Sequence, residues 1–321
     1  MEMDWSHGSG RMIETSETSA GRGKVTWSPV KSIWLSGMTI VAVIAGPFLF
    51  SWSAFAVFIV LTGLTLCAGH SVGMHRRFIH NSFECPLWLE YVMVWLGVLV
   101  GMAGPFGMMR QHDLRDWAQR RKDCHPYLCH GQSIWKDAWW QLHCDLQLEQ
   151  GPEFRPEPRL AADRVYAWME RYWMWQQLPL AIILFALGGW SFVVWGVCAR
   201  VSVSVIGHWL VGWFAHNEGP MRWRVVGAGV QGHDVPIAAL LSMGESWHNN
   251  HHAYPGSARL GLNSDQPDPG WWMILVLERM GLVWDIKTPE TLPHRDALQR
   301  LSEDDGGCPL LKRLIRQAPS H

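Results

Sequence analysis

The sequence predicts an all-α membrane protein with four transmembrane helices in two hairpins and a helical cytoplasmic cap that carries clusters of histidine. Three observations lead to this fold class. Residues 32–70 contain no Asp, Glu, Lys or Arg, and a second uncharged stretch, residues 172–217, is interrupted only by Arg200. The 321 residues include 22 Trp and 16 His, and Trp often collects where an apolar medium meets water. The alternating pattern of a half-buried strand is not evident.

The first hairpin is expected within residues 32–70. This run is close to twice the ~20 residues that cross the hydrocarbon layer as a helix. Gly46-Pro47 and the segment 51–53 are its strongest turn signals. The predicted helices are therefore Ile33–Leu49 and Ala54–Gly69, joined by an uncharged turn.

The second hairpin is expected to consist of helices Leu178–Val197 and Val201–His216, with Arg200 in the turn between them. Positive charges that flank transmembrane helices favour the cytoplasmic side. The flanking charges then place both termini and the polar blocks 76–171 and 218–321 in the cytoplasm, opposed only by Arg200. These charges are Arg22, Lys24, Lys31, Arg76, Arg77, Arg171, Arg222 and Arg224.

One uncharged stretch, Tyr91–Met109, is broken by several glycines and Pro105. As a fifth span it would carry His112 across the membrane from the other histidines, so a buried or interfacial helix is expected instead. Residues 271–281 are also expected to be helical.

Composition excludes several other classes of protein. A net charge of -1 argues against a nucleic-acid partner, which normally requires a basic surplus. The seven Cys are odd in number and include no CxxC pair, which argues against a disulfide framework or a structural zinc site.

The strongest chemical signal is the sequence His248-Asn-Asn-His251-His252. On a helix, residues three and four apart share a face and can converge on one metal or on adjacent metals. The alternative is a polar surface cluster, but the flanking Trp247 and Tyr254 argue against a free tract.

A second pair, His75 and His80, begins just after the second predicted helix. Five residues of α-helix rotate about 140° beyond a full turn, so the helix is expected to end between them, or each to face a different metal. Two interfacial histidines are the alternative reading. His216 closes the fourth predicted helix and is favoured as a ligand, whereas His208 is expected to be structural or to lie outside the ligand set.

These motifs resemble the three histidine boxes of the integral-membrane acyl desaturases, stearoyl-CoA-desaturase-like and closest to the bacterial branch. GHSVGMHRRFIHNSF (69–83) is similar to the first box and GESWHNNHHAYPGSARLGL (244–262) to the third. WFAHNEG (213–219) is similar to the ligand-bearing end of the fourth helix. The resemblance covers about residues 33–289 and implies a membrane and catalytic domain at 32–289, with polar tails at 1–31 and 290–321.

The second box departs from the family's HxxHH pattern. His112 matches its first histidine, but Arg115 and Asp116 replace the next two. Arg stays protonated and cannot coordinate a metal, whereas Asp116 shares a helical face with His112 and can. His125 or His130 could complete the box instead, and Asp116 could be purely structural. Gly212 stands where stearoyl-type relatives have a ligand-like Asn.

The resemblance implies a ligand set of seven histidines with one carboxylate, which suits two iron ions and exceeds the four ligands usual for zinc. The set is His75, His80, His112, Asp116, His216, His248, His251 and His252.

The implied activity is insertion of a cis double bond into a saturated fatty acyl chain, with O₂ and two external electrons. Acyl-CoA is the expected form of the substrate, while double-bond position and chain length are not readable from the sequence. Because the chain has no dinucleotide fingerprint, haem-attachment motif or four-Cys cluster, a separate electron-transfer protein and reductase are expected. Basic residues at 120–122 could meet such a carrier or the phosphates of an activated acyl group, with a solvated charged loop as the alternative. Arg76, Arg77 and Arg259 could contact the substrate headgroup.

Two other functions compete with this interpretation. A di-iron lipid hydroxylase would use the same ligands. A non-enzymatic membrane haem or metal carrier would use His pairs on facing helices.

Overall fold

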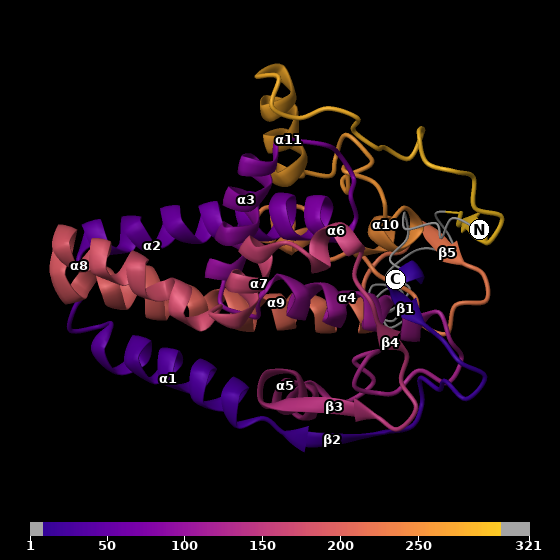
Figure 1. Ribbon diagram of the computed structural model, residues 1–321, viewed down its shortest axis with the longest axis horizontal. Coiled ribbons are helices and arrows are strands. Elements are labelled where there is room, and N and C mark those ends of the chain that lie inside the picture. The colour runs from indigo at the N-terminus through magenta and orange to yellow at the C-terminus, as the bar shows by residue number, and fades with distance from the viewer. Residues whose placement is uncertain (1–8, 303–321) are drawn as a thin grey trace, which may run out of the picture.

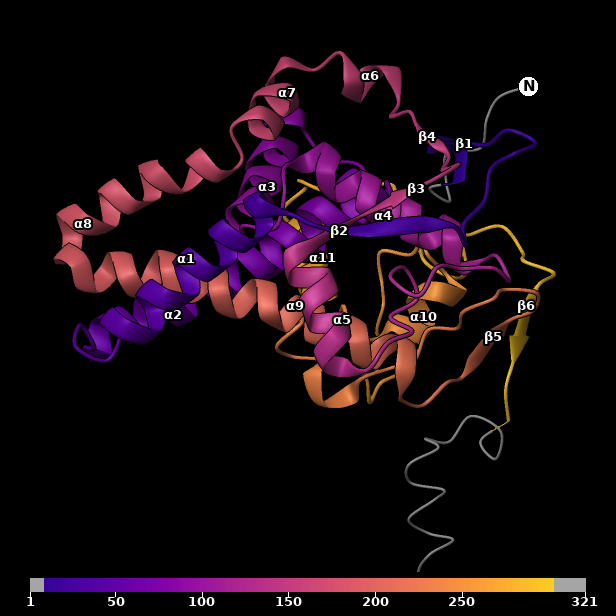
Figure 2. The ribbon, with the colours of Figure 1, turned by 90° about the horizontal axis from the view of Figure 1, so that it is seen from below.

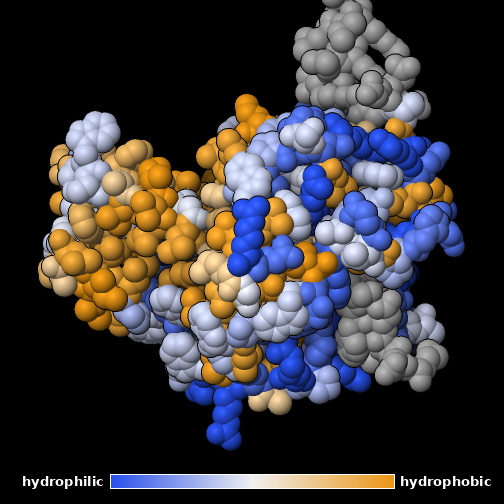
Figure 3. All heavy atoms as spheres, turned by 90° about the horizontal axis from the view of Figure 1, so that it is seen from above, coloured by the Kyte–Doolittle hydropathy of each residue, from blue (hydrophilic) through white to orange (hydrophobic). Residues whose placement is uncertain are grey.

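The computed structural model describes residues 9–302, which form an elongated and mostly helical molecule (Figure 1). Long helices make up one end, and the other end holds shorter helices and strands. The surface of the first end is hydrophobic, whereas polar residues cover much of the second (Figure 3). Two helical stretches, Trp52–Ile79 and Met174–Asn217, are long and apolar enough to cross a membrane. The mainly helical fold is as predicted.

The first predicted hairpin is present with shifted bounds. Helix α1 spans Pro29–Ala45, and α2 spans Trp52–Leu64. The Ser51 side chain caps α2 by accepting the Ala54 N–H at 3.1 Å. The second arm does not end at Gly69 as predicted, because it continues as a π-helix over Thr65–Ile79.

This π-helical segment changes the meaning of the His75–His80 spacing. A π-helix closes hydrogen bonds between residues five apart, as the His80 N–H does with the His75 carbonyl at 3.0 Å. Residues five apart therefore lie on one face. The expectation that these two imidazoles cannot share a helical face was wrong, because it assumed α-helical winding. His70, five residues before His75, falls on the same face.

The second hairpin turns at a different place from the predicted one. Helix α8 (Gln177–Val193) bends back at Gly188 and Gly189, whose backbone angles are not helical, and Gly189 has φ +63° (Figures 1 and 2). The return arm continues through a π-helical turn, Val194–Ala199, into α9 (Arg200–Asn217). The predicted helices with a turn at Arg200 are therefore wrong.

Arg200 lies inside the return arm and is fully buried. Its guanidinium donates to the Leu99 carbonyl at 2.5 Å, to Gln177 Oε1 at 2.6 Å and to the Gly196 carbonyl at 2.7 Å. Because these oxygens accept hydrogen bonds from the guanidinium in place of water, Arg200 can lie inside an apolar arm.

The stretch 91–109 forms parts of two helices, α3 (Leu87–Leu99) and α4 (Pro105–Gln119). Helix α3 is buried along the π-helical segment, as the sequence predicted, and their backbones touch closely. A Cβ on Gly73 would lie 2.6 Å from the Met93 carbonyl carbon, which is closer than atoms pack.

A Gly→Ala substitution should have opposite effects on stability at Gly73, which makes this contact, and at Gly63, which does not. Gly73→Ala should lower the free energy of unfolding by about 1–3 kcal/mol, because the added methyl forces the two helices apart. A Cβ on Gly63 would meet no atom within 4 Å in the described chain, so Gly63→Ala should stabilise by about 0.5–1 kcal/mol through helix propensity. Thermal unfolding in detergent measures both. A stable Gly73→Ala variant would show that the contact is loose.

The remaining elements belong to the block at the polar end of the molecule. Helix α11 matches the helix expected at 271–281. The helices are α5 (Ile134–His143), α6 (Pro158–Ala161), α7 (Arg164–Arg171), α10 (His248–Ala253) and α11 (Pro269–Arg279). Single 3₁₀ turns occur at Ser9–Arg11, Met174–Gln176 and Pro236–Ala238.

Within residues 9–302, three small antiparallel sheets, which the sequence did not predict, tie distant segments together. Each has only two strands, too short for an alternating pattern to be visible. The pairs are β1 (Met12–Ile13) with β4 (Glu153–Phe154), β2 (Gly23–Trp27) with β3 (Cys144–Leu148), and β5 (Trp223–Val225) with β6 (Leu298–Arg300).

The segment expected as an N-terminal tail is thus partly built into the domain. Besides its two strands, it contributes Arg11, which is 1% exposed and lies 3.1 Å from the Asp113 carboxylate and 2.6 Å from that of Glu157. At the other end, β6 belongs to the segment expected as the C-terminal tail. The rest of the two predicted tails, 1–8 and 303–321, lies outside the described residues.

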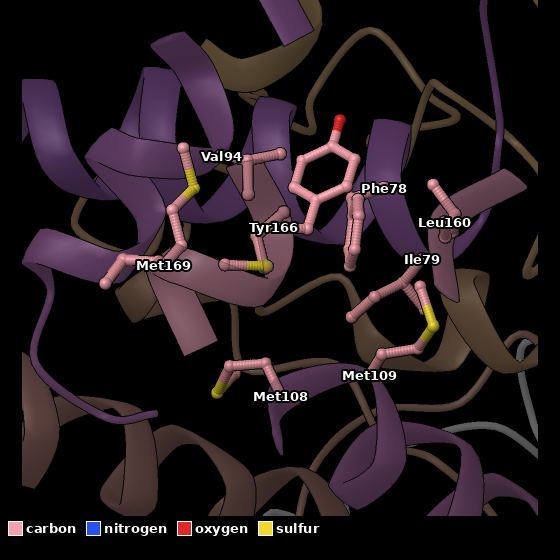
Figure 4. Close-up of a cluster of buried hydrophobic side chains, with 10 residues drawn as sticks. Phe78, Ile79, Val94, Met108, Met109, Leu160, Tyr166 and Met169 are labelled. Atoms are coloured by element: carbon pink, nitrogen blue, oxygen red, sulfur yellow. The ribbon is translucent and has the colours of Figure 1, made fainter. Parts of the chain in front are cut away.

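A hydrophobic core includes two residues that lie between His75 and His80 in the sequence (Figure 4). Phe78 and Ile79 of the π-helical segment pack there with Met109 of α4 and Tyr166 of α7. The Tyr166 hydroxyl donates to the Glu90 carboxylate, so the core's polar group is satisfied. This packing fixes the π-helical segment against α4, which carries the next histidine.

Candidate metal centre

Seven histidines converge in two groups, and all seven are predicted site residues. Within each group the potential ligand atoms lie within 4.8 Å of one another. The elements that bring them together are the end of the π-helical segment, α4, α9 and α10. The first group is His75, His80, His112 and His251, and the second is His216, His248 and His252.

The spacing within each group is that of ligands around a metal ion. His80 Nε2 lies 3.2 Å from His112 Nε2 in the first group. In the second, His248 Nε2 lies 3.2 Å from His216 Nε2 and 3.0 Å from His252 Nε2. Bonds of about 2.0–2.1 Å from a metal to nitrogen put neighbouring donor atoms about 3 Å apart.

Polar groups behind the histidines orient several rings. The Glu245 carboxylate lies 2.6 Å from His75 Nδ1, and that of Asp113 lies 3.3 Å from His112 Nδ1. His216 Nδ1 is 2.8 Å from the Gly212 carbonyl. These contacts leave Nε2 of each ring free to bind a metal.

The third-box histidines are held in their neutral form. Burial first, and then the neighbouring histidines, keep the pKa values of His248 and His251 well below the ordinary range. Burial lowers the pKa of His252 to about 4, although Asp116 opposes this shift. Neutral imidazole is the form that coordinates a metal, so the donor set suits a metal ion at neutral pH.

Asp116 lies beside both groups but, among the described residues, is a member of neither. It follows His112 by four residues on α4, and both residues line the cavity that extends from the histidines. Although burial opposes ionisation, His112, Arg120 and His252 lower the pKa of Asp116. Asp116 lines one cavity together with His112 of the first group and a smaller pocket together with His252 of the second.

The two alternatives to Asp116 also fall outside the groups. His125 Nδ1 accepts the Tyr127 N–H at 3.1 Å, and its ring stacks on Trp140. His130 Nδ1 is 2.8 Å from Asp137, and Arg115 contacts its Nε2.

Arg115, which replaces a family histidine, thus belongs to a buried polar network. His130 stacks on His216 with ring centroids 5.2 Å apart, so the network supports a ring of the second group. Arg115 also donates to Gln141 Oε1 at 3.0 Å. His208 pairs instead with His70, with ring centroids 4.9 Å apart, and lies in neither group.

A cavity of about 240 Å³ begins at the histidines and extends between α1 and α9. His75, His112, His216, His248 and His251 line its polar end. Its walls away from these histidines include large apolar side chains, among them Trp34, Leu35, Met102, Trp173, Val205 and Trp209. The arrangement can hold an extended apolar chain against the two histidine groups.

Arg76 and Arg77, which were expected as headgroup contacts, are buried in ion pairs instead. Arg76 is 1% exposed and binds Asp268 at 2.7 Å, and Arg77 binds Glu90 at 2.7 Å. Sequence reasoning also missed Glu245 as the partner of His75. The Gly-Glu pair before the third box was its only signal.

Comparisons with known proteins agree with this site. A family model described as fatty acid desaturase matches residues 50–262. The chain is 33% identical over 265 residues to the sn-1 stearoyl-lipid 9-desaturase of Anabaena variabilis, covering 82% of this chain and 94% of the relative. It is 34% identical over 243 residues to the sn-2 palmitoyl-lipid 9-desaturase of Nostoc sp. (strain 36), covering 74% and 82%. It is 29% identical over 280 residues to the acyl-CoA 5-desaturase AL21 of Anemone leveillei, covering 85% of each.

Fold and site together define a helical protein with a two-part histidine centre at one end of an apolar cavity. The matched segment spans more than half of the chain and includes every histidine of both groups. The chain belongs to the fatty acid desaturase family, and its relatives include bacterial members. It is therefore an oxidoreductase that desaturates fatty acyl chains, as the resemblance implied.

Proposed function

We propose that this protein is a membrane di-iron desaturase that inserts a cis double bond into a saturated fatty acyl chain, using O₂ and two electrons from an external donor. The observation that carries this proposal is the convergence of seven histidines, in two groups, at the end of a cavity lined by large apolar side chains. Two separate groups favour two metal ions over one.

The ligands we propose are the seven histidines, with Asp116 between the groups. Two iron ions would supply the activation of O₂ that removal of hydrogen from unactivated methylenes requires. The protein's own contribution is positional, because the cavity walls hold the acyl chain at a fixed depth beside the histidines. Glu245 and Asp113 hold the imidazoles of His75 and His112 in place.

We propose that four apolar arms cross the membrane, with the histidines and both termini in the cytoplasm. The arms are α1, α2 with the start of the π-helical segment, α8 up to its bend at Gly188 and Gly189, and the return arm that continues into α9. Helix α1 has 17 residues, about 26 Å, close to the ~30 Å hydrocarbon thickness. The far turns near Phe48 and Gly189 carry no charged residue, and Arg200 no longer opposes the positive-inside rule because it is buried in an arm.

For the partners, we propose acyl-CoA as the acyl donor and a separate electron carrier with its reductase. The relatives' names include both lipid-linked and CoA-linked substrates, so both forms need to be supplied in the test. Of the basic residues expected to meet the carrier, Arg121 lies 2.5 Å from Glu14 and stacks over Trp117.

Metal analysis of the purified protein combined with lipid profiling of an expressing host tests the proposal. About two irons per chain and an acyl product lighter by two hydrogens are expected. A product with an added oxygen would favour the hydroxylase, and a strong haem absorbance without further iron would favour the carrier. Either result contradicts the proposed function.

Asp116→Ala is expected to weaken metal binding by about 10–100-fold and to reduce desaturation accordingly, because the carboxylate lies beside both groups. Iron per chain and product yield are the measurements. Asp145→Ala is the control, since Asp145 lies outside both groups and pairs with Lys31. Normal iron content and turnover in Asp116→Ala would make Asp116 a structural residue.

A further inference from the structure

The second histidine group has three members, one fewer than the first. Helix α4 passes both groups, presenting His112 to the first and then Asp116. Gln119 follows His112 by seven residues, two turns along the same face, and is 2% exposed. The helix thus brings a buried amide to the group that has fewer histidines.

The amide end of Gln119 lies at ligand spacing from this group. Its Nε2 is 2.9 Å from His216 Nε2, close to the 3.2 Å and 3.0 Å that join His216 to His248 and His248 to His252. Four donor positions therefore follow one another at the separation that bonds of about 2.0–2.1 Å to one metal ion produce.

The oxygen of the same amide lacks a partner. Gln119 Oε1 is buried and accepts no hydrogen bond from residues 9–302, while Nε2 also donates to the Leu128 carbonyl at 2.9 Å. A buried acceptor without a partner is rare and costs stability, which indicates that something other than protein satisfies it. Gln119 also lines a small pocket that contains His251 and His252, so the amide stands within the metal centre.

We propose that Gln119 is a further protein ligand of the metal held by His216, His248 and His252, in addition to Asp116, and that it binds through Oε1. This inference rests on the proposed metal centre. A metal ion takes the His216 lone pair that now accepts the amide N–H, and a cation repels that N–H. Turning the amide over about its last bond gives up both hydrogen bonds of Nε2 in exchange for a metal–oxygen bond, and the Leu128 carbonyl must then turn away from Oε1. An amide carbonyl oxygen is a neutral donor that divalent metals accept.

Three variants test this assignment through metal binding itself. Gln119→Leu removes the oxygen at similar size, and Gln119→Glu keeps an oxygen in place. Gln147→Leu is the control, because Gln147 is exposed on β3 and lies in neither group. Ferrous iron is titrated into each metal-free protein, and iron per chain is measured. Co²⁺ is titrated in parallel, since its visible spectrum reports the coordination of each site.

Wild type, Gln119→Glu and Gln147→Leu should each bind two metals. Gln119→Leu should bind the first metal normally, bind the second at least tenfold more weakly, and lose one of the two cobalt spectral components. Wild-type binding of both metals by Gln119→Leu would overturn the inference and leave the proposed function standing. Loss of both metals in Gln119→Leu and Gln119→Glu alike would also overturn it, because Gln119 would then serve the fold. A wild-type protein that binds neither metal would instead contradict the proposed function.

Discussion

Replacing His251 by Ala should abolish desaturation and release iron from both parts of the metal centre. His251 belongs to the first group, with ring centroids 4.7 Å from His75 and 4.9 Å from His80. It also stacks on His248 of the second group at 5.6 Å. Loss of a residue behind a ligand already costs about 10–100-fold in metal affinity, so loss of a ligand itself should cost more.

The measurements are iron per chain after dialysis and product yield by mass spectrometry. His294→Ala is the control, because that side chain is 88% exposed and lies in neither group. It should keep both metals and full turnover. Full activity in His251→Ala would remove the third box from the site, and with it the main support for the proposed function.

Asp268→Ala should produce the largest loss of stability, about 3–5 kcal/mol in the free energy of unfolding. Asp268 and Arg76 are each 1% exposed and pair at 2.7 Å, so the substitution leaves an uncompensated charge in the interior. The carboxylate also accepts the N–H groups of Leu260, Gly261 and Trp271 at 2.8, 3.0 and 2.9 Å. Its loss therefore frees the loop after the third box and removes the cap of α11.

Chemical unfolding in detergent gives this free energy directly. Glu153→Ala removes a comparable pair at the surface, where Arg155 and Glu153 are both more than half exposed, and should change stability by less than about 1 kcal/mol. Asp268→Leu together with Arg76→Met should recover part of the loss, because neither charge then stays buried. Equal stability of Asp268→Ala and wild type would show that Arg76 finds other partners.

The histidine centre could be predicted from the sequence because its signal is local. His248, His251 and His252 stand within five residues, and His75 and His216 lie near the ends of uncharged runs. The supporting contacts could not be predicted in the same way. Glu245 meets His75 from a segment 170 residues away, and Arg11 reaches Asp113 from the segment expected as a tail.

The fold was predictable to a similar extent. Uncharged runs revealed the apolar arms, but the position of the second turn depended on which groups form hydrogen bonds with the Arg200 guanidinium. Its hydrogen bond to the carbonyl of Leu99, about 100 residues earlier, allows a charge within an arm, while Gly188 and Gly189 make the turn. Similarly, β2 pairs with a strand about 120 residues later, which local pattern does not reveal.

The π-helical segment makes the five-residue period of its histidines sensitive to length. Deleting one residue between His75 and His80 would leave a spacing of four, which suits α-helical winding, and the two rings could then meet only if the segment tightened. Tightening would also rotate His80 relative to His70 and Gly73, which lie earlier in the segment. Natural variants of this chain should therefore keep the number of residues between the two histidines unchanged.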